Sequence, residues 1–167
     1  MESDKKIIDF ITHNIQIKSI TQTIINELNK TALKVEENCT EKINYFLSKL
    51  DGQKIKNLEK ILLTISDINE VIQICIKSME KIFQDGKIST SDMPLFIEMI
   101  VDIVKTIKEK DISEDIKNVV DLCEFICQVV IVCMNKMQET ELFLKILSSS
   151  ITLLKFELNP RKFLPCC

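Results

Sequence analysis

Cysteine is the residue type in this chain with the widest chemical range, and the chain has seven of them. Cys123 and Cys127 are four residues apart, a spacing that places both on one face of a helix. A metal site would need further ligands, and the one histidine, His13, is distant in the sequence. Free cysteine is among the most buried residue types. We therefore predict that both pack in a core, and the sequence predicts no metal site.

Catalytic machinery is equally hard to assemble from these residues. A cysteine nucleophile needs a histidine within reach, and His13 lies among polar neighbours where surface exposure is the expectation. Two glycines leave none for a phosphate-binding loop. Paired carboxylates such as Glu36-Glu37 are typical of solvated helix faces. The sequence therefore predicts no catalytic residue, no cofactor and a non-enzymatic protein.

The residues around Gly86 do not supply the ligands of a calcium-binding EF-hand loop. With Gly86 at the sixth position of an EF-hand loop, Asp92 falls at the twelfth, as that loop requires. The first and third positions are then Lys81 and Phe83, which supply no oxygen ligand. A capped junction between two helices is the better interpretation.

The C-terminal segment holds the candidate partner-binding residues Phe163, Leu164, Cys166 and Cys167. A terminal Cys-Cys can be prenylated in vesicle-traffic GTPases, but those enzymes need a phosphate-binding loop that this chain lacks. Palmitoylation, cross-linking to a neighbouring chain and plain free thiols all stay open. The apolar Phe163 and Leu164 suit docking into a groove on a partner protein.

Charge and cysteine usage restrict the expected partners and the expected cellular compartment. Lysine and arginine number 22 against 25 acidic residues, and Arg161 is the one arginine, so we expect no nucleic-acid partner. The first residues lack the apolar stretch of a secretory signal. The longest uncharged run, Phe125–Asn135, is shorter than the roughly 18–20 apolar residues that span a bilayer. An odd number of cysteines without CxxC pairs favours a reducing compartment, so an intracellular location is expected.

The apolar spacing is helical almost everywhere, and no segment alternates as a strand would. We predict a single-domain, all-α bundle of five to seven helices over residues 1–159, followed by a short cysteine-ended tail over residues 160–167. The stretch Phe125–Met134 is apolar nearly all round, which indicates a central helix surrounded by the others.

Several residues predict helix boundaries. Asn29–Thr31 is a weak break, and Asp51-Gly52 is a stronger one because glycine after aspartate often ends a helix. Pro94 suits the first turn of a helix, where its missing N–H costs nothing. Thr140 is predicted to cap the last helix, and Asn159-Pro160 to end it.

The segment Asp85–Asp92, continued by Met93-Pro94 and the apolar run to Ile100, resembles a helix–turn–helix of small all-helical proteins of nucleocytoplasmic large DNA viruses. The Lys, Ile and Asn bias is similar to that of AT-rich viral genomes. The resemblance implies a minor capsid or virion-associated component. Such a protein would bind neighbouring virion proteins through amphipathic helices and its tail, and would reside in the host cytoplasm and the virion. The same surfaces could also join copies of the chain into an oligomer.

A second resemblance is one of architecture. A central apolar helix wrapped by amphipathic ones is similar to the helical apoptosis-regulator fold of poxviruses, with Phe125–Met134 as the central helix. It implies an alternative function, in which the protein takes a partner helix in an apolar groove. The Asn-Trp-Gly-Arg-type signature of cellular members is absent from the sequence.

Overall fold

The computed structural model describes most of the chain between residues 15 and 158. The described residues are 15–31, 33, 35–64, 68–83, 91, 93–109, 116–134 and 137–158, without the side chains of residues 15, 106–108, 116, 137–139, 157 and 158.

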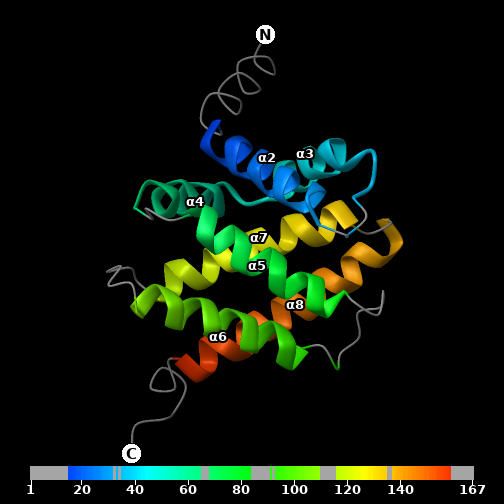
Figure 1. The fold of residues 1–167 in the computed structure, drawn as a ribbon. Helices are drawn as coiled ribbons and strands as arrows, with labels where there is room; N and C mark the ends of the chain where they lie inside the picture. Colours follow the sequence, from blue (N-terminus) through cyan, green and yellow to red (C-terminus); the bar gives the residue numbers. More distant parts are fainter. Residues whose placement is uncertain are drawn as a thin grey trace, which may run out of the picture.

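The predicted all-α fold is confirmed, since the described residues form a bundle of seven helices and contain no strand (Figure 1). The helices are α2 (Ile15–Asn29), α3 (Cys39–Lys49), α4 (Gly52–Thr64), α5 (Ile68–Ile82), α6 (Met93–Glu109), α7 (Ile116–Met134) and α8 (Met137–Leu158).

Helix α7 is the centre of the bundle. It contacts each of the other six helices, and Figure 1 shows it crossing behind α5, with α2, α3 and α4 on one side. Between Phe125 and Cys133 every side chain except Gln128 is buried. The predicted central helix is therefore confirmed. Its burial explains why an apolar surface on all sides is tolerated there.

The Asp51-Gly52 break is confirmed, but its role differs from the predicted one. The Asp51 carboxylate accepts a hydrogen bond from the N–H of Gln53 at 3.1 Å, and the Asp51 carbonyl accepts one from Ile55 at 3.1 Å. Asp51 therefore caps the start of α4, and Gly52 is the first residue of that helix. Glycine is not required here, because a Cβ at Gly52 would meet nothing within 4 Å.

Of the other predicted helix boundaries, three are confirmed and one is wrong. Helix α2 ends at Asn29, and Pro94 lies in the first turn of α6, both as predicted. Helix α8 ends at Leu158, directly before Asn159-Pro160. The predicted Thr140 cap is wrong, because α8 already begins at Met137.

Some predictions fall outside the described residues. These are the His13 environment, most of the turn at 85–92, and the tail at 160–167 with Phe163, Leu164, Cys166 and Cys167. Within the described part of the chain, no helix combines the length and the apolar character needed to cross a bilayer.

Candidate functional site

An apolar groove opens where α3 passes the end of α7 and the start of α8. It has a volume of about 430 Å³, within the usual range for ligand and partner pockets. Its lining residues are Asn38, Glu41, Lys42, Tyr45, Phe46, Lys49, Val132, Thr140, Glu141 and Leu144. Tyr45, the only tyrosine of the chain, has a large side chain, yet 59% of it is exposed. We call this surface the α3–α8 groove.

The periodicity of α3 explains why Tyr45 faces outward. Cys39, Ile43 and Leu47 form the buried face of the helix at intervals of four residues. Tyr45 and Phe46 follow at positions that this face does not absorb, so Tyr45 is exposed and Phe46 is half-buried. Tyr45 thus belongs to the groove, whereas Phe46 lines the groove and also packs against the core.

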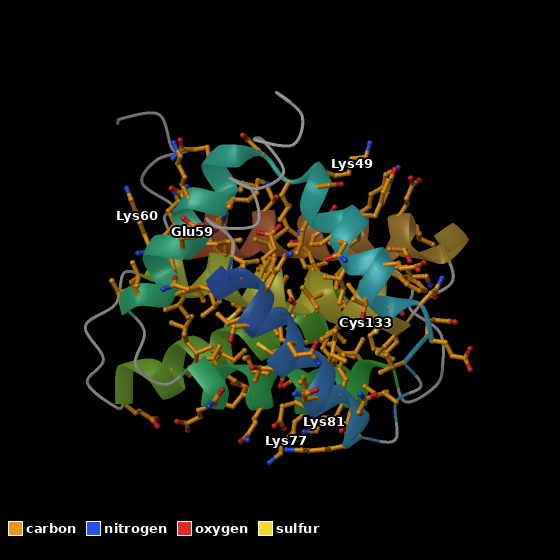
Figure 2. All side chains as sticks on the ribbon, turned by 90° about the horizontal axis from the view of Figure 1, so that it is seen from above. Lys49, Glu59, Lys60, Lys77, Lys81 and Cys133 are labelled. Carbon is orange, nitrogen blue, oxygen red and sulfur yellow. The ribbon has the colours of Figure 1, made fainter. Side chains whose placement is uncertain are left out.

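Charges border the α3–α8 groove. The Lys49 ammonium lies 5.3 Å from the centroid of the Tyr45 ring, a cation–π contact that holds this lysine beside the aromatic surface. Lys49 lies at the outer end of α3 in Figure 2. Glu141 stands on the α8 side of the same groove. The α3 side also contributes Glu41 and Lys42, so both edges are charged and the α3 edge holds charges of both signs.

A second, polar cleft lies between α4, α7 and α8, with a volume of about 280 Å³. Its apolar lining comes from Leu50, Leu58, Ile61, Phe125 and Ile151, and its polar lining from Lys54, Asn57, Asp121, Glu124, Gln128, Ser148, Thr152 and Lys155. We call it the α4–α7–α8 cleft.

Two carboxylates of α7 stand in different environments within this cleft. Asp121 accepts a hydrogen bond from the Lys155 ammonium at 2.8 Å, which forms an ion pair between α7 and α8. Burial raises the pKa of Glu124, Lys155 and Lys54 act in the opposite direction, and the Asp121 charge adds to the rise. A paired carboxylate beside one with a raised pKa is an arrangement that acid–base sites also use.

Sequence reasoning missed this cleft. Asp121, Glu124 and Gln128 recur at intervals of three and four along a helix that is otherwise apolar, so they share one face. That spacing was the available signal. These three residues lie on the side of α7 that the neighbouring helices leave half-exposed. The predicted apolar helix, Phe125–Met134, began only after Glu124.

The cysteines form two groups inside the bundle. Cys123 and Cys127 are fully buried, as predicted, and they meet Cys75 of α5. Hydrogen bonding with these two thiols, followed by burial, raises the pKa of Cys75 well above its ordinary value. Among the described residues, no group of three or more histidine, cysteine, aspartate or glutamate side chains is placed to hold a metal ion.

The second group joins Cys39, at the start of α3, to Cys133, near the end of α7. Burial, together with the neighbouring Cys39 thiol, raises the pKa of Cys133 to about 12, and Lys42 partly offsets the rise. Figure 2 shows Cys133 beside the segment that leads into α3. This pair lies directly next to the α3–α8 groove, because Asn38 and Val132 line it.

Comparison with known proteins gives no relative. No protein-family model matches the chain, and neither the curated proteins nor the solved structures contain a significant match. These comparisons therefore do not test the resemblance of residues 85–100 to viral helical proteins, which stays a prediction.

Proposed function

We propose that the protein is a non-enzymatic interaction protein that binds a helix of a neighbouring protein in the α3–α8 groove. The observation that carries the proposal is the exposure of Tyr45, 59% of whose surface is open to solvent at the edge of an apolar hollow. Tyrosine is strongly enriched in the centres of protein interfaces, because it offers a large apolar area and a polar hydroxyl.

The groove has the chemistry of a helix-binding surface. Tyr45, Phe46, Val132 and Leu144 offer a floor for the apolar residues of an amphipathic helix. Glu41, Lys42 and Lys49 on the α3 edge and Glu141 on the α8 edge offer charged partners to the polar residues of that helix. The proposed occupant is therefore an amphipathic helix with an apolar face bordered by charged residues.

The setting is a viral particle, and the support for it is the resemblance of Asp85–Ile100 to minor capsid and virion-associated proteins. In that setting the neighbour is another virion protein, and the tail residues Phe163, Leu164, Cys166 and Cys167 add a second contact. An apoptosis-regulator-like protein would use the same groove for a helix of a host protein.

A photo-cross-linking amino acid at position 45 tests the proposal. In purified particles, the cross-linked product should contain one virion protein at a fixed ratio, joined through a helical segment. The matched control is position 63, since Leu63 on α4 is similarly exposed and lies outside the groove. Absence of the protein from particles, with capture of a host helix instead, would favour the regulator. Equal cross-linking from both positions would contradict groove binding.

The α4–α7–α8 cleft supports a second candidate, an enzymatic or small-ligand function. The observation that favours it is Glu124, a half-buried carboxylate with a raised pKa beside the paired Asp121. The described lining contains neither histidine nor cysteine. A thermal-shift screen with small polar compounds tests this candidate, and stabilisation of wild type but not of Glu124→Gln would support it.

A further inference from the structure

Two backbone hydrogen bonds, both made by Glu36, link the backbone of Cys39 to that of Cys133. The N–H of Glu36 donates to the carbonyl of Cys133 at 2.9 Å, and the N–H of Cys39 donates to the carbonyl of Glu36 at 3.1 Å. These two hydrogen bonds hold the start of α3 against the end of α7. Helices α3 and α7 also contact each other directly.

The two side chains point into the same place. Both are buried, with 6% of Cys39 and 0% of Cys133 exposed, and both belong to the one hydrophobic core. The Cys39 thiol is close enough to hydrogen-bond with Cys133 and to contribute to its electrostatic environment. Adjacent backbones and mutually facing thiols are the requirements for a disulfide.

We propose that Cys39 and Cys133 are a redox pair that forms a disulfide when a small disulfide, such as glutathione disulfide, accepts their two electrons. In the first step the Cys39 sulfur, the more exposed of the two, attacks the small disulfide. It forms a mixed disulfide and releases one thiol. The Cys133 sulfur then attacks the Cys39 sulfur and releases the second thiol. The protein loses two hydrogens, and the oxidant leaves as two thiols.

The environment of Cys133 slows the second step of this reaction, in which its sulfur attacks the mixed disulfide. A pKa of about 12 keeps Cys133 almost entirely protonated near neutral pH, and thiol–disulfide exchange requires the thiolate. Oxidation is therefore slow, and it is faster when the start of α3 opens transiently. The pair suits a lasting change of state rather than a rapid sensor.

The disulfide would close a loop that spans more than half of the chain. Long closed loops restrict the unfolded chain most strongly, so the melting temperature should rise by about 10 °C. Resting on the proposed function, the bond would also fix α3 against α7 beneath the α3–α8 groove and pre-organise it for its partner helix.

The test uses the full-length protein, incubated with glutathione disulfide and then digested without reduction. The expected product is a peptide that links Cys39 to Cys133, together with the rise in melting temperature. Peptide mapping separates this product from any disulfide of Cys166 or Cys167. The Cys39→Ser variant should lose both results. The matched control Cys75→Ser should keep both, because Cys75 lies in the other group.

Two outcomes would overturn the proposal. One is that Cys39 and Cys133 remain alkylatable after prolonged oxidation, and the other is that Cys75 cross-links to Cys123 or Cys127 first. The mass measurement needs no binding partner, so it stands whether or not the groove binds a helix.

Discussion

The Lys155 ammonium of α8 lies 2.8 Å from the Asp121 carboxylate of α7, across thirty-four residues of sequence. The pair joins the last helix to the central one at the α4–α7–α8 cleft. The Asp121 side chain is 26% exposed and the Lys155 side chain is 40% exposed, so water screens their attraction only in part.

A double-mutant cycle with Asp121→Asn and Lys155→Met should give a coupling energy of about 1 kcal/mol, measured by chemical denaturation. The control is the exposed pair Lys30–Glu27, at 3.1 Å with 72% of the lysine side chain exposed. Its coupling should stay below about 0.5 kcal/mol. Equal couplings for the two pairs would show that the cleft gives Asp121 no special environment.

Glu124 predicts a pH dependence of stability. Its pKa is raised in the folded protein, chiefly by burial, so the folded chain holds this proton more tightly than the unfolded chain. Below the ordinary carboxyl pKa both states are protonated, and Glu124→Gln should leave stability unchanged. As the pH rises through the ordinary and then the raised pKa, wild type loses stability that the variant keeps. At pH 7 the variant should melt at the higher temperature.

Thermal melts at several pH values between 3 and 8 check this prediction. The control is Glu98→Gln, an exposed carboxylate on α6, which should stay close to wild type throughout. A Glu124→Gln variant that is less stable than wild type at pH 7 would mean that the ionised carboxylate has a stabilising partner.

Ile126 tests the central place of α7. Its side chain is fully buried, so Ile126→Asp would place an unpaired charge in the core and should cost more than about 4 kcal/mol. Circular dichroism and melting should show loss of the fold. The control Leu63→Asp, at a position with 71% exposure, should change stability by less than about 1 kcal/mol. Retained helicity and melting temperature in Ile126→Asp would contradict the packing of α7.

Deletion of Arg161–Cys167 separates the tail from the groove. We expect an unchanged melting temperature, since the described core lies within residues 15–158, and a weaker interaction with the partner. Calorimetry and a binding titration measure the two effects. An unchanged affinity would refute the contribution of Phe163, Leu164, Cys166 and Cys167.

Helical periodicity and composition were enough to predict the fold class, the central helix and several helix ends. The apolar faces repeat strongly, and Pro94 and Asn29 are local signals that tertiary packing does not override. The Thr140 prediction was wrong because α8 already begins at Met137, which places Thr140 within the first turn of the helix rather than before it.

The candidate sites were much harder to predict. The α3–α8 groove depends on which side chains of α3 stay uncovered after the helix packs, and the sequence alone does not show this. In the sequence, Tyr45 has the spacing of an ordinary residue of an amphipathic helix. The Cys39–Cys133 contact joins residues that are far apart in the sequence, and only the three-dimensional fold brings them together. Asp121, Glu124 and Gln128 did carry a local signal, the shared helix face, which the apolar character of their helix obscured.

The most direct test of the central claim is the affinity of the purified partner helix for three forms of the protein. The account predicts that Tyr45→Asp binds at least ten-fold more weakly than wild type, since it loses an exposed aromatic contact and places a negative charge in the groove. Leu63→Asp should bind as wild type does, and all three should melt at similar temperatures. Equal affinity of Tyr45→Asp and wild type would contradict binding in the α3–α8 groove.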